Sequence, residues 1–227
     1  EDIDNLCKAL NISSVIARLL INRGFSTPEQ AKDFLNKSVD QLHNPYLMKD
    51  MDKAVERIKK ALERGERITI YGDYDVDGVT STTILYQYLT SLGGKVDYYI
   101  PDRVEEGYGV NSSAITTIFE GGTTLLITVD SGITAIEEME IASSLGMDVI
   151  ITDHHECTDT LPKALAVIDP KRPDCEYPYK NLAGVGVVFK LICAMAGPEK
   201  LGEIIDGYSE LCALGTTADV MPLNGEN

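Results

Sequence analysis

The chain has 227 residues, of which 44% are hydrophobic and 25% are charged. This composition is typical of a folded globular domain and excludes disordered, collagen-like and coiled-coil proteins. The longest apolar stretch, at residues 182–197, is interrupted by Lys190 and by glycines, and it is too short to cross a bilayer as a helix. We therefore expect a soluble protein with no membrane partner.

The net charge of −16 is unevenly distributed along the chain. Residues 1–50 carry 7 acidic and 6 basic side chains, whereas residues 51–227 carry 29 acidic and 14 basic ones. Residues 104–162 contain no Lys or Arg, which argues against a broad nucleic-acid groove there, because such grooves depend on contacts to phosphate. The acidic excess indicates a solvated surface, or bound divalent cations that offset part of it.

Five cysteines are spread along the chain without any CxxC or CxxH pair. This spacing predicts neither a zinc site nor a compact disulfide framework, and it favours the reducing cytoplasm. The chain begins with Glu1 rather than Met and shows no signal segment, so we expect a processed piece of a longer protein.

Short helices are predicted in the first part of the chain. Ser13 can cap an apolar run that follows it, and the sequence STPE at residues 26–29 combines capping residues with a proline in the first turn. Apolar residues then recur at helical spacing over residues 51–67. We divide the chain into an N-terminal helical segment at residues 1–50 and a catalytic domain at residues 51–227.

Apolar, β-branched runs alternate with helical patterns after residue 67. Strands are predicted at residues 68–71, 96–100, 125–129, 149–152 and 166–168. Helices are predicted at residues 79–92, 113–119, 135–145, 182–195 and 201–214, followed by a loop at residues 215–219. This alternation predicts an α/β fold with a parallel β-sheet that is covered by helices on both faces.

Four polar clusters follow predicted strands or the last predicted helix. They contain Asp73, Asp75 and Asp77; Asp130; Asp153, His154 and His155; and Asp219. Ligands of an open parallel sheet bind beyond the carboxyl ends of its strands. A single Asp after a strand is usually a helix cap or a turn residue, but several carboxylates in one pocket repel one another unless a hard cation binds them.

Carboxylates with one imidazole suit Mn²⁺ or Mg²⁺ better than zinc. The two adjacent histidines point different ways, so at most one is expected to be a ligand. His154 is favoured because it directly follows Asp153 at a strand end, and His155 then orients substrate or supports the ligands from behind. There are enough carboxylates for two ions that share one Asp, and two-metal sites hydrolyse phosphate esters. The chain has no nucleophile elbow, P-loop or dinucleotide-binding motif. The residues alone therefore predict a metal-dependent hydrolase that cleaves phosphoester bonds.

The chain resembles the DHH phosphoesterase family, which is named for the triplet present here as Asp153-His154-His155. Four segments carry the resemblance: YGDYDVDGVTS at residues 71–81, TVDSG at 128–132, TDHH at 152–155 and ALGTTADVMPL at 213–223. The flanking segments PDRVEEGYG at 101–109, DPKRPDCEYP at 169–178 and LAGVGVVFKL at 182–191 are similar to one branch of the family. This branch degrades single-stranded DNA, and the resemblance covers essentially the whole chain.

The resemblance implies a single-strand-specific 5′→3′ DNA exonuclease that releases mononucleotides in DNA repair and recombination. It implies two Mn²⁺ or Mg²⁺ ions, with Asp75 and Asp77 on different ions, Asp130 bridging them, and His154 and Asp219 completing the second. Many family members have a histidine where this chain has Tyr71, and Asp73 is the expected substitute.

The resemblance also implies substrate contacts and partners. His155, Arg103 and the backbone of Gly184 and Gly186 would hold substrate phosphates, although both glycines are equally well explained by close helix packing. Family members carry a second domain after the fourth motif, which closes the cleft and grips nucleic acid. We expect a monomer whose possible partners, besides single-stranded DNA, are single-strand-binding proteins or helicases.

Three alternatives remain open from the sequence. Residues 75–80 also resemble the DxDGT motif of haloacid-dehalogenase-type phosphatases, but Asp75 lies three residues beyond Gly72 and residues 104–162 supply no lysine. Within the DHH family, an oligonucleotide or cyclic-dinucleotide phosphodiesterase or a pyrophosphatase is possible. A non-enzymatic alternative is a replication-factor module with a decayed site, against which the complete set of candidate ligands argues.

Overall fold

The computed structural model describes residues 2–36, 38–107 and 109–227. It divides into two compact units: a smaller one, Glu1–His43 with Asn224–Glu226, and a larger one, Asn44–Leu223 with Asn227. This division falls seven residues before the boundary predicted at residue 50, because the segment after Asn44 joins the larger unit. Met48 is buried in the main core of that unit, and the hydroxyl of Tyr46 donates a hydrogen bond to the carbonyl of Ala194 at 2.9 Å.

The smaller unit contains short helices, as the sequence predicts. They are α1 (Asp2–Leu10), α2 (Ser14–Asn22), α3 (Pro28–Leu35) and the 3-10 turn η1 (Val39–Gln41). The side chain of Ser13 caps α2, and Thr27 with Gln30 forms a capping box at the start of α3. Leu6, Ala17, Leu20 and Ala31 are buried together in a small core.

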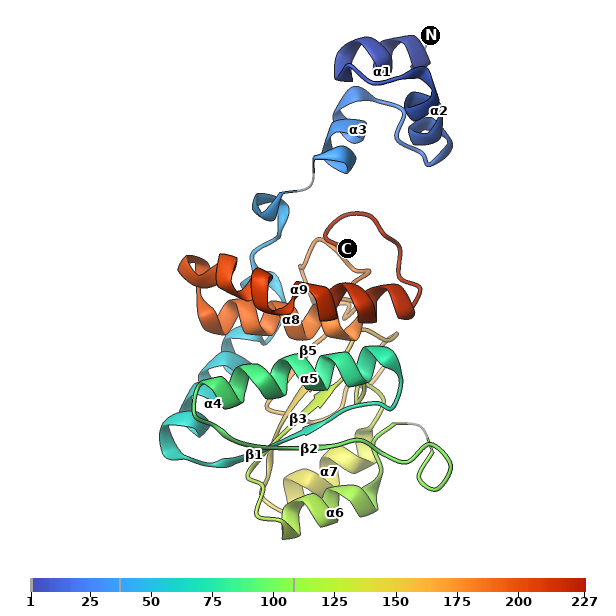
Figure 1. Ribbon diagram of the computed structural model, residues 1–227. Helices are drawn as coiled ribbons and strands as arrows, with labels where there is room; N and C mark the ends of the chain where they lie inside the picture. Colours follow the sequence, from blue (N-terminus) through green and yellow to red (C-terminus); the bar gives the residue numbers. More distant parts are fainter. Residues whose placement is uncertain (1, 37, 108) are drawn as a thin grey trace. The chain divides into compact units, whose positions relative to one another are not determined.

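The larger unit is an α/β fold with one five-stranded sheet (Figure 1). Its strands are β1 (Arg67–Tyr71), β2 (Lys95–Tyr99), β3 (Leu125–Val129), β4 (Asp148–Thr152) and β5 (Ala166–Ile168). Its helices are α4 (Met51–Arg64), α5 (Val76–Ser91), α6 (Ser112–Glu120), α7 (Ile136–Ser144), α8 (Gly184–Ala196) and α9 (Leu201–Ala218), with 3-10 turns η2 (Pro45–Leu47) and η3 (Pro198–Lys200). All pairings are parallel in the order β2-β1-β3-β4-β5, which confirms the predicted fold class.

Helices cover both faces of this sheet, as the apolar strands require. Alternate residues of a strand enter separate cores, so Ile68 and Ile70 of β1 pack with α4, α5 and α8, whereas Tyr71 packs with α6 and α7. The last helix, α9, packs against α5 and α8 (Figure 1). No helix in the described part of the chain is long and apolar enough to cross a membrane.

Several helix ends differ from the sequence prediction by one or more residues, and two of these differences position site residues. α5 begins at Val76 rather than at residue 79, because the side chain of Asp75 caps it. The loop predicted at residues 215–219 is wrong, since α9 continues to Ala218. Gly215 lies so close to α5 that a Cβ atom there would be 2.4 Å from Oγ1 of Thr80. This close packing outweighs the weak helix propensity of the Gly-Thr-Thr sequence.

Candidate metal centre

Two carboxylates follow β1 at the carboxyl edge of the sheet. Asp73 is 2% exposed, and its Oδ1 accepts a hydrogen bond from the backbone N–H of Tyr74 at 2.6 Å. Burial raises the pKa of Asp73, and the nearby charge of Asp75 adds to this effect. The exposed Asp75 accepts from the N–H of Gly78 at 2.9 Å as the cap of α5. The loop between β1 and α5 thus holds Asp75 at the exposed edge of the site and Asp73 inside it.

Asp77 connects the first turn of α5 with the beginning of α8. Its side chain is 2% exposed, and its two oxygens accept hydrogen bonds from the N–H groups of Gly184 (2.7 Å) and Val185 (2.8 Å). Burial raises the pKa of Asp77, and the bonds from the two helix N–H groups only partly oppose this. The carboxylate is therefore fixed in position from two elements that are far apart in the sequence.

The two glycines predicted to hold phosphate have packing roles in the structure. The N–H of Gly184 is already bonded to Asp77, and a Cβ atom at Gly184 would lie 2.6 Å from Cβ of Asp130. Gly186 is buried, and its nearest neighbour outside its own helix backbone is the side chain of Leu182. The structure therefore argues against the predicted phosphate contact at Gly184, and at Gly186 it favours the alternative of close packing.

The imidazole of His154 lies among three carboxylates that come from three different elements. Its Nε2 is 3.1 Å from Oδ1 of Asp130, 3.6 Å from Oδ2 of Asp219 and 3.7 Å from Oδ2 of Asp77. Asp130 follows β3 in a left-handed backbone conformation with φ 54°, and Asp219 is the C-cap residue of α9. The extension of α9 thus delivers Asp219 to the end of the sheet.

Three sets of potential ligands have atoms within 4.8 Å of one another. They are Asp73, Asp75 and Asp130; Asp77, His154 and Asp219; and Asp130, His154 and His155. Asp130 and His154 each belong to two of the sets, and their side chains, 3.1 Å apart, connect the three groups. The structure therefore brings all four predicted clusters together at one edge of the sheet.

Several polar atoms at the centre of this cluster are buried and unsatisfied. Among the described residues, Oδ1 of Asp130 and both ring nitrogens of His154 make no hydrogen bond, since the 3.1 Å contact between Nε2 and Oδ1 lacks the required angles. Burial and the charges of Asp77 and Asp75 raise the pKa of Asp130, as expected for carboxylates held together without a counter-charge. Buried polar groups are normally paired. Oxygen-rich donors with one imidazole fit Mn²⁺ or Mg²⁺, and a cation would satisfy these atoms.

Asp153 has a positioning role that sequence analysis did not assign. It is 1% exposed; one oxygen accepts from the N–H of Ile133 at 2.9 Å, and the other lies 2.7 Å from Nδ1 of His155. Although burial opposes the charged form, the bonds from His155 and Ile133 lower the pKa of Asp153. The same bond raises the pKa of His155 to about 9. The signal in the sequence was a carboxylate directly before two histidines at the end of a strand.

Arg103 lies in the exposed loop that follows β2. Its guanidinium carbon is 5.4 Å from the centroid of the Tyr74 ring, a distance typical of a cation–π contact. Since Tyr74 stands between Asp73 and Asp75 in the chain, the structure brings Arg103 beside the carboxylate loop.

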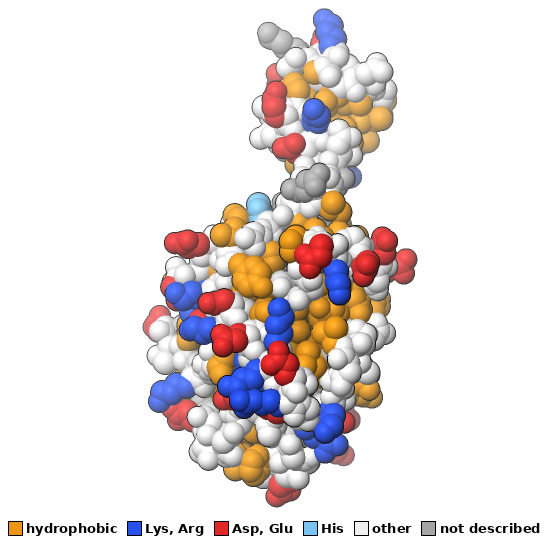
Figure 2. Space-filling model, turned by 90° about the vertical axis from the view of Figure 1, so that its left-hand side faces the viewer, with side chains coloured by type: hydrophobic (Ala, Val, Ile, Leu, Met, Phe, Trp, Pro, Cys, Tyr) orange, Lys and Arg blue, Asp and Glu red, His pale blue; other side chains and the backbone are white. Residues whose placement is uncertain are grey.

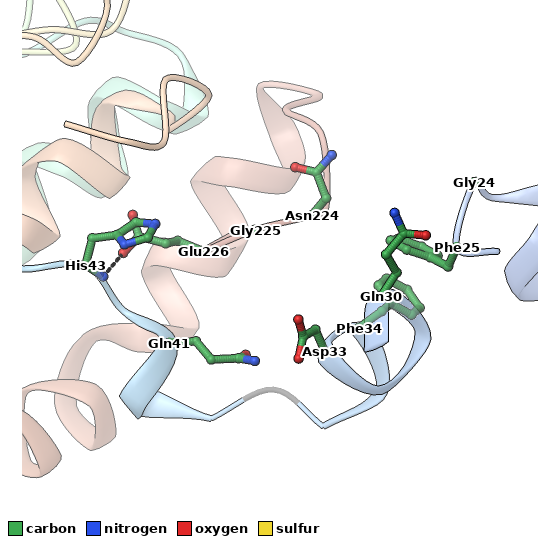
Figure 3. Close-up of a pocket in the computed structure, with 10 residues that line it drawn as sticks. All are labelled: Gly24, Phe25, Gln30, Asp33, Phe34, Gln41, His43, Asn224, Gly225 and Glu226. Carbon is green, nitrogen blue, oxygen red and sulfur yellow. Dashed lines mark hydrogen bonds between the residues drawn. The ribbon is translucent and has the colours of Figure 1, made fainter. Parts of the chain in front are cut away.

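A separate pocket lies within the smaller unit (Figure 3). It is lined by Gly24, Phe25, Gln30, Asp33, Phe34, Gln41, His43, Asn224, Gly225 and Glu226. The N–H of His43 donates to Oε1 of Glu226 at 2.7 Å. None of the predicted site residues lines this pocket, so the carboxylate cluster remains the candidate for chemistry.

Comparison with known proteins identifies the family. The N-terminal domain of the DHH family matches residues 67–216. Over its whole length, the chain is 48% identical to the single-stranded-DNA-specific exonuclease RecJ of Bacillus subtilis (strain 168), of which it covers 28%. Over 94% of its length, it is 38% identical to the protein of the same name from Escherichia coli (strain K12), of which it covers 38%.

The fold is also similar to that of a RecJ structure. The crystal structure of RecJ from Thermus thermophilus in complex with Mn²⁺ matches 98% of this chain with a TM-score of 0.78 and 33% identity, and 31% of that protein is covered. The chain thus spans about a third of the length of these relatives. Because the family domain matches more than half of the chain and contains the first three carboxylate clusters, this chain belongs to the DHH family.

Proposed function

We propose that this chain is the catalytic part of a single-strand-specific DNA exonuclease that hydrolyses phosphodiester bonds from the 5′ end with two Mn²⁺ or Mg²⁺ ions. The observation that carries the proposal is the buried cluster in which Asp130 lies between two sets of ligands and has an unsatisfied oxygen. The similarity to RecJ of Bacillus subtilis supports single-stranded DNA as the substrate.

Each carboxylate has a defined role in this proposal. Bound divalent cations would activate water as the nucleophile and stabilise the charge that develops on the phosphate. Asp73 and Asp75 would hold one ion, Asp77, His154 and Asp219 would hold the other, and Asp130 would contribute to both. The distances among these side chains support this division.

His155 and Arg103 act on the substrate. The hydrogen bond from His155 to Asp153 keeps the imidazole charged at neutral pH and fixes its orientation, so that it contacts a non-bridging oxygen of the scissile phosphate. Arg103, which lies beside Tyr74 of the carboxylate loop, binds another phosphate of the strand.

The charge of the chain supports local contacts rather than a long basic track. Residues 51–227 carry 15 more acidic than basic side chains. On the face drawn in Figure 2, Lys and Arg side chains of the larger unit are interspersed with Asp and Glu. We further propose that the protein works as a cytoplasmic monomer together with single-strand-binding proteins or helicases.

Digestion of end-labelled DNA tests the proposed function. With Mn²⁺, labelled mononucleotides should appear at the start of the digestion of 5′-labelled single strands. They should appear much more slowly from 3′-labelled single strands and from duplex DNA. Hydrolysis of cyclic dinucleotides or pyrophosphate at a higher rate than single-stranded DNA would favour the alternatives within the family. No hydrolysis of any of these substrates would refute the proposal.

Mn²⁺ should stabilise the protein against thermal unfolding. Repulsion among Asp73, Asp75, Asp77 and Asp130 opposes folding without metal, and binding at about 100 times Kd stabilises by about 2.7 kcal/mol, or roughly 5–10 °C for a chain of this size. Differential scanning calorimetry with and without Mn²⁺ measures the shift. An equal shift in the Asp75→Asn/Asp130→Asn double variant would show that the ion binds elsewhere.

Replacing Arg103 by Ala should raise KM for single-stranded DNA about tenfold with little change in kcat, because a charged contact to substrate is lost outside the reacting atoms. Steady-state kinetics with a short 5′-phosphorylated strand measures both constants. Lys163→Ala is the matched control, since Lys163 is exposed and paired with Glu140. Equal KM values for the two variants would show that Arg103 does not contact the substrate.

A further inference from the structure

The exposed segment that carries Arg103 is closed into a tight turn by two carboxylates. Oδ1 of Asp102 accepts hydrogen bonds from the N–H groups of Val104 (2.8 Å) and Glu105 (3.0 Å). In return, Oε2 of Glu106 accepts from the N–H of Asp102 at 2.7 Å. Arg103 therefore lies inside a turn whose backbone is held from both sides, although the next side chain, Val104, is 92% exposed.

Glu106 anchors this turn to the sheet and to the following helix. Its Oε1 accepts hydrogen bonds from the hydroxyl of Tyr99, the last residue of β2, and from Nδ2 of Asn111 at 3.1 Å. Asn111 is itself the N-cap residue of α6, so its side chain is fixed by the helix that it caps. One carboxylate thus joins the turn to two elements of the fold.

Tyr71 adds a second anchor from the interior of the sheet. It is fully buried at the end of β1, and its ring stacks on that of Tyr99 at 5.3 Å between centroids. Its hydroxyl donates to the carbonyl of Gly109 at 2.9 Å and lies 3.4 Å from Nδ2 of Asn111. The hydroxyl of Tyr71 therefore binds the loop after β2, and Tyr71 belongs to none of the three ligand sets described above.

We propose that Tyr71, Tyr99 and Glu106 are positioning residues that hold Arg103 beside Tyr74 for contact with a substrate phosphate. The three anchors act through the turn and do not touch the substrate, whereas Arg103 contacts it directly. A pre-positioned guanidinium binds phosphate at a smaller entropy cost than one on a loose loop. This inference rests on the proposed function, because it assigns the substrate contact that the anchored turn serves.

Kinetics of Glu106→Ala tests the link to substrate. We expect KM for a short 5′-phosphorylated strand to rise about fivefold to tenfold, with kcat within about twofold of wild type. Glu106→Gln keeps one acceptor oxygen and should restore part of the loss. The matched control is Glu105→Ala, which removes the same charge from a residue for which only a backbone hydrogen bond is described. Its KM should stay level or fall, because a negative charge near the substrate is removed.

Coupling with Arg103 gives the decisive comparison. If Glu106 acts through Arg103, Glu106→Ala should add little to the KM of Arg103→Ala, since interacting residues are not additive. Equal KM values for Glu106→Ala and Glu105→Ala, or full additivity in the double variant, would overturn the proposal. If wild-type protein does not degrade single-stranded DNA, the proposed function itself fails, and the proteolysis experiment below still tests the anchors.

Limited proteolysis measures the anchoring without metal or substrate. Arg103 is the one trypsin site between Lys95 and Lys163, so cleavage after it gives a characteristic fragment. Tyr71→Phe and Tyr99→Phe remove one hydroxyl each and should speed this cleavage severalfold. The control Tyr98→Phe alters an exposed residue beside Tyr99 and should leave the rate unchanged. Cleavage at the wild-type rate in both hydroxyl variants would show that these bonds do not hold the turn.

Discussion

Replacing Asp130 by Ala should lower kcat for single-stranded DNA by at least about 10³-fold, which corresponds to about 4 kcal/mol of lost transition-state stabilisation. The carboxylate lies 3.1 Å from His154 and belongs to two of the three ligand sets. Because Asp130 is the residue proposed to contribute to both ion positions, its loss should affect both at once. Single-turnover digestion of labelled single strands with Mn²⁺ measures the effect.

The same substitution should not unfold the protein. Asp130 is buried with its pKa raised by burial and by neighbouring charges, so its removal relieves repulsion; this gain offsets the cost of placing Ala at φ 54°, and the Tm without metal should stay close to that of the wild type. The Mn²⁺-dependent rise in Tm should shrink at the same time. Asp206→Ala, on the exposed side of α9, is the control for loss of one acidic residue. Turnover near the wild-type rate in Asp130→Ala would refute the two-ion proposal.

Replacing Gly184 by Ala should lower kcat about 10²-fold, although residue 184 contributes no side chain to the site. A Cβ atom there would lie 2.6–2.8 Å from Cβ, Cγ and Oδ1 of Asp130, and these atoms cannot yield without moving the backbone after β3. A displacement of about 1 Å at a catalytic group costs on the order of 10²-fold in rate. Steady-state kinetics and circular dichroism together separate this effect from misfolding.

Gly186→Ala is the matched control for this prediction. Its Cβ would meet the side chain of Leu182 at 3.3 Å, which can adjust by a few tenths of an ångström. Both substitutions introduce the same methyl group into the first turns of α8, where Ala is the better helix former. If Gly184→Ala keeps wild-type kcat, or if both variants lose the same activity, the close approach of α8 to Asp130 does not control the site.

The order of the strands and helices could be predicted from the sequence because it depends on local patterns. Apolar runs of four or five residues predicted β1 and β3 within one residue, since a strand buried on both faces needs a continuous apolar sequence. The carboxylates directly after these strands could be located for the same reason, because parallel strands place their carboxyl ends at one edge. The roles of individual ligands remain proposals, supported by the distances.

The tertiary structure decided what depends on segments far apart in the chain. Asp77 and Gly184 are 107 residues apart, and their hydrogen bond uses the N–H group that the sequence analysis expected to contact a substrate phosphate. The continuation of α9 through Gly215 follows from close contact with Thr80 of α5. Local helix propensity carries no information about this contact.

The positioning residues could likewise be placed at strand ends from the sequence, but their hydrogen-bond partners could not. Tyr71 ends a predicted strand, but its hydroxyl bonds to Gly109, 38 residues later. Asp153 follows β4 as predicted, yet its bond to the N–H of Ile133 comes from the loop after β3. A sequence pattern specifies which residues end a strand and which face is apolar, because both follow from neighbours along the chain. The packing of helices and loops over the sheet decides which buried donor meets which acceptor.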